Sequence, residues 1–277
     1  MLNSKQIMER GRDALKGNWG KAAIFTLILV IAILVVSGIL DVDNFVKEPV
    51  YPDPSKGIEG DLSTLPAYVL LGLGFALIST ILWNAVSVGE AKIFIHLVDN
   101  GEFNWKHITH GLHKLGRNTL SVLLYTLVLT CALGLIGGGI IFVTAFISTL
   151  TSHVSETAGI VIFVIGAVIL AGIAGFFLYK FLPTYIMLFM KLALDDKVKS
   201  VPAIKETFHT VAPYNWEFCC LSLRFTGWLL LCCVTCGIGF LWVSPYMSAS
   251  FYVFYKECIA DQENYSNDEV LTVSTEK

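Results

Sequence analysis

The chain has 277 residues, of which 55% are hydrophobic and 15% are charged. Since soluble domains usually carry about 25% charged residues, this composition argues against an ordinary water-soluble domain. The net charge of −3 and the absence of a basic stripe argue against nucleic acid as a partner.

The first half of the chain contains three apolar segments that are long enough to cross a membrane. Residues 22–40 and 67–89 are predicted to be the first two spans, with a polar loop at 41–65 between them. At a rise of 1.5 Å per residue, about 20 helical residues cross the roughly 30 Å hydrocarbon core of a bilayer. The third segment, 121–150, is longer than one span needs, and Gly137-Gly138-Gly139 inside it predicts a kink or a break.

Three more spans are predicted in the second half of the chain. The fourth covers 158–179 and is expected to continue past Pro183 towards the membrane surface. The fifth covers 218–236, and a shorter sixth span has its core at 245–255. Gly-rich turn chemistry between the last two spans indicates a tight hairpin.

Lysine and arginine are divided unevenly between the two sides of the predicted membrane. One side carries 16 of the 19, while the other carries only Lys47 and Lys56. Because short cytoplasmic loops are rich in Lys and Arg, we predict that both termini lie in the cytoplasm. The predicted fold is an all-α polytopic transmembrane bundle of about six spans. It has one transmembrane domain over 1–260 and a disordered acidic tail over 261–277.

Two of the predicted cytoplasmic loops carry an apolar stripe at helical spacing. In each loop the apolar residues are 3, 4 and 3 positions apart: Trp105, Ile108, Leu112 and Leu115, and then Val201, Ile204, Phe208 and Val211. Such helices are expected to lie flat in the membrane interface while neighbouring lysines reach anionic headgroups. The N-terminal segment has a looser version of the same pattern, so two or three amphipathic interfacial helices are expected.

An asparagine follows each of these amphipathic segments and precedes a span. Asn18, Asn118 and Asn215 are about 100 residues apart, which suggests three copies of one unit: surface helix, Asn, span, outer loop, span. The copies would cover 1–100, 101–199 and 200–260. Chance and ordinary amphipathicity are the alternative explanation. Each Asn could act as a helix N-cap, or all three could share a role around a threefold-like axis.

The C-terminal third contains a specific sequence signature. It reads Phe225-Thr226-Gly227-Trp228, then Gly237-Ile238-Gly239-Phe240-Leu241-Trp242-Val243-Ser244-Pro245-Tyr246, then Phe251-Tyr252. This pattern resembles the signature of the uncharacterised bacterial membrane family known as domain of unknown function 975. The motif positions are Gly227, Trp228, Gly237, Gly239, Trp242, Pro245 and Tyr246, while Arg224 stands where the family usually has a small polar Ser. The resemblance implies a protein of the bacterial cytoplasmic membrane and supplies no mechanism.

Two charged residues lie in or at the ends of predicted spans. Arg224 is about six residues, or roughly 9 Å, inside the fifth span. Its long side chain could reach back to the headgroups, or it could pair with Glu90, which ends the second span on the same side.

Candidate chemical groups are few. His107, His110 and His113 fan across one helix face and converge poorly for a metal ion. Cys232, Cys233 and Cys236 include a C-x-x-C spacing, but the strand–helix context of a redox motif is missing. The sequence therefore indicates no catalytic, cofactor-binding or metal-binding residues.

We expect a non-enzymatic inner-membrane scaffold, regulator or lipid-handling protein. Its expected partners are the bilayer, anionic headgroups at the cytoplasmic face, and a protein that the sequence does not identify. A transporter or permease built from three hairpins is the main alternative. A membrane-embedded enzyme is a third alternative, without a visible catalytic constellation.

Overall fold

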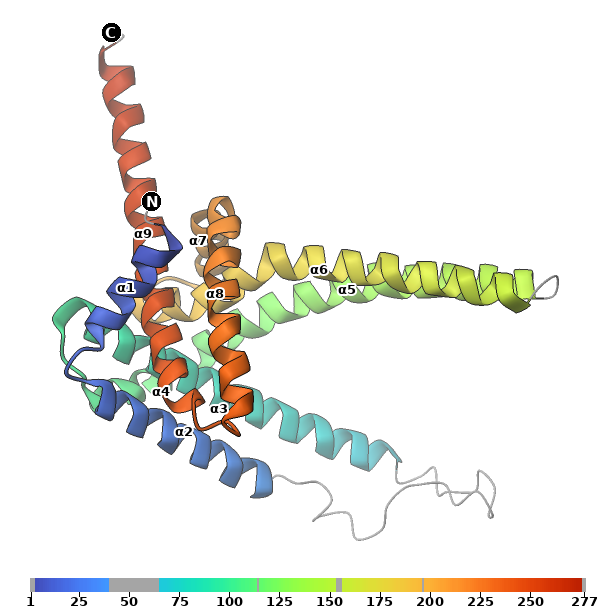
Figure 1. Cartoon of the computed structure of the whole chain (residues 1–277), viewed down its shortest axis with the longest axis horizontal. Helices are drawn as coiled ribbons and strands as arrows, with labels where there is room; N and C mark the ends of the chain where they lie inside the picture. The colour runs from blue at the N-terminus through green and yellow to red at the C-terminus, as the bar shows by residue number, and fades with distance from the viewer. Residues whose placement is uncertain (1–2, 40–64, 114, 153–155, 196, 276–277) are drawn as a thin grey trace.

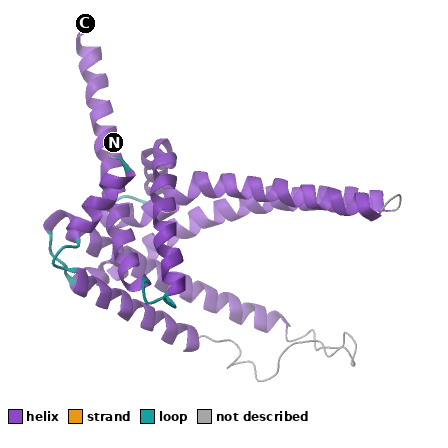
Figure 2. Ribbon diagram, in the orientation of Figure 1, coloured by secondary structure: helices purple, strands orange, loops and turns teal. Residues whose placement is uncertain are grey.

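The computed structural model describes residues 3–39, 65–113, 115–152, 156–195 and 197–275. This part of the chain is 92% helical and contains no strand, which confirms the all-α prediction. Figure 2 shows the helices and the short loops that join them.

The helices alternate between short and long in a regular order. The elements are α1 (Ser4–Ala14), α2 (Trp19–Ile39), α3 (Leu65–Asn100), η2 (Trp105–Thr109), α4 (His110–His113), α5 (Leu115–Ser152), α6 (Glu156–Leu194), α7 (Ser200–Val211), η3 (Ala212–Tyr214), α8 (Asn215–Val234) and α9 (Phe240–Thr275). Short helical segments followed by two long helices occur three times in this order. Whether these units are copies of one another stays a prediction.

The long helices form three projections from a common body. In Figure 1, α5 and α6 extend from the body as a long pair, and α2 and the first part of α3 extend in a second direction. The hairpin of α8 and α9 takes a third direction, so the projections fan out. Beyond the hairpin, α9 continues through the body towards the C-terminus.

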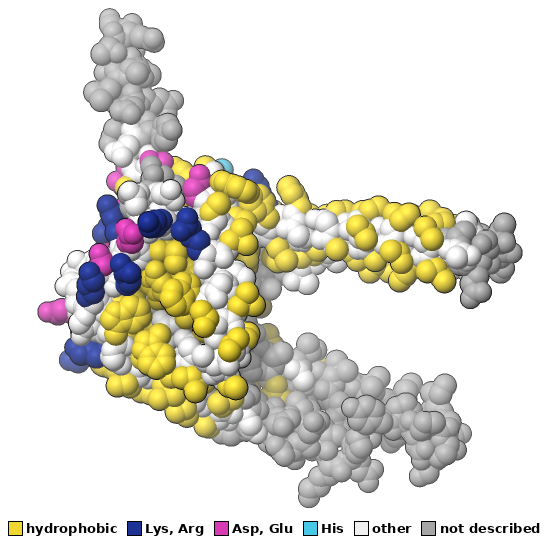
Figure 3. Space-filling view, viewed as in Figure 1, with side chains coloured by type: hydrophobic (Ala, Val, Ile, Leu, Met, Phe, Trp, Pro, Cys, Tyr) yellow, Lys and Arg dark blue, Asp and Glu magenta, His cyan; other side chains and the backbone are white. Residues whose placement is uncertain are grey.

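The projecting helices have the composition of membrane spans. Four helical segments of the described chain are long and apolar enough to cross a membrane, and a fifth is obtained if α1 and α2, bent by 94°, form one broken span. In Figure 3 the arm of α5 and α6 is largely hydrophobic, while Lys, Arg, Asp and Glu gather on the body. The chain is therefore an apolar helical protein of the polytopic membrane type, and the count of six spans stays a prediction.

The sixth predicted span, in α9, is not among these segments because its interior is less apolar. It contributes two of the fully buried aromatic side chains of the body, Phe254 and Tyr255, at 0% and 1% exposure. Serines and tyrosines also lie along this helix, and some of them bond to neighbouring helices: Ser248 Oγ donates to Glu90 (2.9 Å) and Tyr252 Oη donates to Asp99 (2.7 Å). A helix surrounded by protein can carry such groups because its neighbours satisfy them.

Two glycines let the η2–α4 segment pack directly on α3. A Cβ placed on Gly111 would lie 1.8 Å from the carbonyl oxygen of Ala85, and a Cβ on Gly89 would lie 2.3 Å from that of Ile108. At both glycines the backbone of one segment therefore packs directly on the backbone of the other. The close approach fixes the position of α4 relative to α3.

Two details of the predicted helices are corrected by the structure. Gly137-Gly138-Gly139 does not break α5, which continues through the glycines as one helix of 38 residues. A glycine inside a helix costs only about 1 kcal/mol, and pairing with α6 stabilises the arm. The 261–275 part of the predicted disordered tail continues α9 to Thr275. Extending an existing helix avoids the cost of nucleation.

The predicted amphipathic helices differ from expectation in length and in rotation. The segment at 105–113 is a 3₁₀ turn followed by a single α turn, not one continuous helix. In α7 the buried residues are Ser200, Ala203, Thr207 and Val211, so three of the four are small or polar. Val201, at the start of the predicted stripe, is 64% exposed. The tightest packing selects the small face of α7 because bulky side chains would hold the helix away from the body.

Candidate functional site

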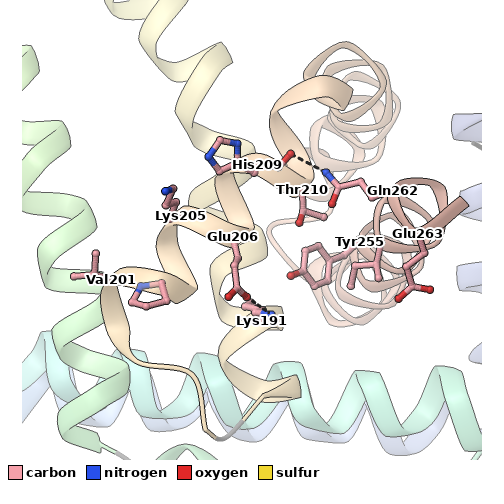
Figure 4. Close-up of a pocket in the computed structure, with 11 residues that line it drawn as sticks. Lys191, Val201, Lys205, Glu206, His209, Thr210, Tyr255, Gln262 and Glu263 are labelled. Atoms are coloured by element: carbon pink, nitrogen blue, oxygen red, sulfur yellow. Dashed lines mark hydrogen bonds and ion pairs between the residues drawn. The ribbon is translucent and has the colours of Figure 1, made fainter. Parts of the chain in front are cut away.

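Helix α7 separates two hollows of opposite chemical character. On one side lies a cleft of about 950 Å³, here called the α7–α9 cleft. It is lined by Lys191 of α6, by Val201, Pro202, Lys205, Glu206, His209 and Thr210 of α7, and by Tyr255, Ile259, Gln262 and Glu263 of α9. Figure 4 shows these side chains arranged between α7 and α9.

Two polar contacts within the α7–α9 cleft connect α7 to its neighbouring helices. Lys191 Nζ lies 2.7 Å from Glu206 Oε2, and Gln262 Nε2 donates to the carbonyl oxygen of His209 over 2.9 Å (Figure 4). The first contact joins α6 to α7 and the second joins α9 to α7. Together they hold α7 in place while leaving the Lys205 side chain outside both pairs.

On its other side, α7 closes a groove of about 440 Å³, here called the apolar groove. Its walls are Leu124, Tyr125, Val128, Leu129 and Ala132 of α5, Phe177 and Phe181 of α6, and Val201, Ile204, Lys205 and Phe208 of α7. Aromatic rings form one wall, since Phe181 stacks on Phe177 at 5.5 Å and on Phe208 at 5.9 Å between centroids. Two of its three walls thus belong to α5 and α6, the long apolar pair of helices.

Lys205 and Val201 line both hollows. Lys205 is the one charged residue in the lining of the apolar groove. Its side chain is exposed and forms no ion pair or hydrogen bond with other residues in the described ranges. A free ammonium group therefore stands at the boundary between an apolar groove and a polar cleft.

Two cations, Lys92 of α3 and Arg117 of α5, bind the end of α6 and thereby fix the position of α7. Arg117 donates to the carbonyl oxygens of Leu192 (3.0 Å) and Asp195 (2.9 Å), and Lys92 donates to that of Ala193 (2.8 Å). These carbonyls have no intrahelical partner because they end a helix, and the cations also complement its dipole. The turn that follows is fixed by Asp195, whose pKa is lowered by the hydrogen bond it accepts from the Lys197 amide.

The three asparagines occupy comparable positions but make different contacts. Asn18 donates to the Gly101 carbonyl over 2.9 Å and so ties the start of α2 to the end of α3. Asn118 is buried inside α5, where its amide group faces the Gly111 carbonyl (3.4 Å) and its oxygen accepts from Arg117 (3.0 Å). Asn215 is buried, and its Oδ1 has no partner in the described part of the chain.

Helix capping is therefore not the common role of these asparagines. Asn118 lies inside α5, and the N-cap position of α8 belongs to Tyr214. The contacts of Asn18 and Asn118 differ from each other, and a shared role of the three asparagines around one axis stays a prediction.

The proposed pairing of Glu90 with Arg224 is not formed. Glu90 accepts a hydrogen bond from Ser248 of α9, whereas Arg224 is exposed on α8 and lines a separate pocket beside the start of α1. Hydropathy gave no information about the rotation of each helix, which decides whether two side chains can meet.

The motif positions of the C-terminal signature build the α8–α9 hairpin. Gly237 has a φ of +85° at the turn, a conformation that side chains disfavour, and Gly239 packs against Cys232 Sγ. Tyr246 stacks edge-on against Phe225 (5.1 Å between centroids), which clamps the two helices together. Pro245 lies inside α9, while Gly227, Trp228 and Trp242 lie on exposed surfaces. The contacts of Gly237, Gly239 and Tyr246 therefore stabilise the turn and the packing of the hairpin.

The histidine and cysteine patterns do not form a metal centre in the structure. Within the described ranges, no three His, Cys, Asp or Glu side chains converge as ligands. His107 instead packs on His96 at 4.6 Å between ring centroids, and burial lowers its pKa. Cys233 and Cys236 are exposed at the tip of the α8–α9 hairpin with free thiols.

The sequence did not reveal the apolar groove. The i, i+4 spacing of Phe177 and Phe181 indicates one aromatic helix face, but apolar faces are ubiquitous in spans. Only the packing of α7 across α5 and α6 turns that face into the wall of a groove.

Comparison with known proteins adds a family to this description. The family model described as "Protein of unknown function (DUF975)" matches residues 1–262, which confirms the resemblance found in the C-terminal signature. No curated protein and no solved structure matches the chain.

Proposed function

The chain belongs to the family described as protein of unknown function (DUF975), and from its structure we propose that it is a non-enzymatic, lipid-handling membrane protein. The apolar groove would receive an acyl chain, and Lys205 would bind the anionic headgroup. Among the roles expected from the sequence, the groove supports lipid handling over those of a scaffold or a regulator. The observation that carries the proposal is a free cation at the mouth of an aromatic groove.

The location and topology form part of this proposal. The protein would be a multi-pass protein of the bacterial cytoplasmic membrane with both termini in the cytoplasm. The uneven distribution of Lys and Arg along the sequence supports this orientation. It would put α7 at the cytoplasmic interface, where the ammonium group of Lys205 lies at headgroup level.

The chemistry of the groove favours an amphiphile over a soluble apolar molecule. Two walls of the groove belong to α5 and α6, and only 6% of the residues in an apolar 18-residue stretch of each helix are buried within the protein, so lipid chains would surround the groove. An acyl chain gains little hydrophobic energy by leaving the bilayer for a groove, because both environments are apolar. Selectivity must therefore come from shape and from the headgroup.

The contribution of Lys205 to selectivity can be bounded. One Lys near an anionic membrane surface contributes about 1 kcal/mol of attraction, which corresponds to roughly a fivefold preference. The paired Lys191 contributes less because Glu206 offsets its charge. We therefore expect a modest preference for anionic over zwitterionic lipids at this site.

Two substitutions separate the roles of chain and headgroup. Lys205→Gln should abolish the roughly fivefold preference for anionic lipid while leaving total lipid binding nearly unchanged. Ile204→Trp should fill the groove and remove the bound lipid whatever its headgroup. Native mass spectrometry of the purified protein, supplied with equal amounts of phosphatidylglycerol and phosphatidylcholine, measures both effects.

Lys106→Gln is the matched control for the headgroup effect. Lys106 lies on η2 and lines neither hollow, so its replacement should not alter the lipid ratio. If Ile204→Trp retained the full complement of bound lipid, the groove would not be the binding site.

A further inference from the structure

A third hollow lies between the start of α1 and the first three turns of α8. This α1–α8 pocket has a volume of about 600 Å³ and shares no residue with the α7–α9 cleft or the apolar groove. It is lined by Asn3 and Ser4 at the start of α1, and by Trp216, Glu217, Cys220, Leu223 and Arg224 of α8.

The pocket contains one carboxylate and one guanidinium that do not pair with each other. Glu217 Oε2 is shielded from solvent and accepts no hydrogen bond from the described residues. Arg224 is exposed and makes no ion pair or hydrogen bond within the same ranges. Since a shielded carboxylate oxygen without a donor is costly, the pocket lacks a cationic hydrogen-bond donor.

The first turn of α1 does not supply that donor. The amides of Asn3 and Lys5 are satisfied locally, because Gln6 Oε1 accepts from the Asn3 amide and Asn3 Oδ1 accepts from the Lys5 amide. The polar character of the pocket therefore depends on Glu217 and Arg224.

The order of the two charges along α8 matches the order of charges in a phospholipid headgroup. Seven residues separate them, which is two helical turns or about 10 Å. In the proposed topology α8 enters the membrane at Asn215, so Glu217 lies at the level of the headgroups and Arg224 lies deeper. The flexible Arg224 side chain can reach back towards the surface.

We propose that the α1–α8 pocket binds an aminophospholipid, with Glu217 accepting hydrogen bonds from the primary ammonium and Arg224 donating to the phosphate. Trp216 and Leu223, both 65% exposed, would flank the headgroup and the first part of the acyl chains. A phosphatidylglycerol headgroup offers Glu217 no cation. A phosphatidylcholine headgroup carries a cation without an N–H donor.

The test is a competition between three phospholipids. The full chain, carrying Ile204→Trp to empty the apolar groove, is supplied with equal amounts of phosphatidylethanolamine, phosphatidylcholine and phosphatidylglycerol and is analysed by native mass spectrometry. Because hydrogen bonds to charged groups are strong, we expect phosphatidylethanolamine to be enriched roughly tenfold over each competitor. Equal binding of the three lipids would overturn the proposal.

Two substitutions assign the enrichment to the two charges. Glu217→Gln should reduce the ratio of phosphatidylethanolamine to phosphatidylcholine to about one, whereas Arg224→Gln should lower the binding of both. Glu102→Gln, an exposed carboxylate outside the pocket, should leave the ratio unchanged. A ratio retained in Glu217→Gln would contradict the assignment. Should that variant fail to fold, the lipid ratio of the unsubstituted pocket decides alone.

Discussion

Gly111→Ala is expected to destabilise the protein by about 3 kcal/mol or more. The new Cβ would lie 1.8 Å from the Ala85 carbonyl oxygen and 2.7 Å from its carbonyl carbon. These are backbone atoms of a buried helix and cannot rotate away, so α4 and α3 must separate. The separation would also open the reciprocal contact between Gly89 and Ile108. In detergent, we expect the melting temperature to fall by on the order of 10 °C.

Gly116→Ala is the matched control for this substitution. Gly116 is also helical, five residues further along the chain, but a Cβ there would meet no atom within 4 Å. Because alanine favours helix over glycine by about 1 kcal/mol, this variant should be as stable as the parent or slightly more stable. Equal melting temperatures for the two variants would show that the close contact between α4 and α3 does not determine stability.

Arg117→Ala is expected to cost about 3–5 kcal/mol. The guanidinium donates to the carbonyls of Leu192 and Asp195 at the end of α6, and Ser200 Oγ donates to the Arg117 carbonyl. Alanine would leave the helix-end carbonyls without their charged donor and would loosen the turn into α7. Arg117→Lys should recover part of the loss, since an ammonium group can serve only some of these acceptors.

Arg10→Ala provides the comparison for a solvent-exposed arginine. Arg10 pairs with Glu257 over 2.8 Å, but its side chain is 59% exposed. Such pairs contribute at most about 1 kcal/mol, so this variant should melt close to the parent temperature. Chemical or thermal unfolding in the same detergent compares the variants. A smaller loss for Arg117→Ala than for Arg10→Ala would contradict the role given to Arg117.

The long apolar helices were predictable because hydrocarbon imposes a simple rule on sequence. A helix in lipid must be long and apolar, so the predicted span at 22–40 lies almost wholly within α2. Helix ends in the body were less predictable. The second span was expected to end at residue 89, yet α3 continues to Asn100. Its polar end packs on α9, where the Asp99 carboxylate accepts hydrogen bonds from Tyr252 and Lys256.

Helix rotation set the limit for predicting the site. Apolar residues surround most of each span, so periodicity cannot tell which face meets protein and which meets lipid. For α7 the strongest apolar stripe was expected to decide the orientation, but the small residues Ala203 and Thr207 face the body instead. That rotation turns Ile204 and Phe208 towards α5 and α6 and creates the apolar groove.

We propose that the hairpins cross the membrane and that α7 lies on the cytoplasmic side. Cys236 lies exposed at the tip of the α8–α9 hairpin and should therefore face the outside. The measurement is labelling of intact cells with a membrane-impermeant maleimide, using a chain in which Cys236 is the only cysteine. We expect labelling without permeabilisation, whereas Lys197→Cys in a cysteine-free chain should be labelled only after permeabilisation. The opposite pattern would contradict the topology and the cytoplasmic location of α7.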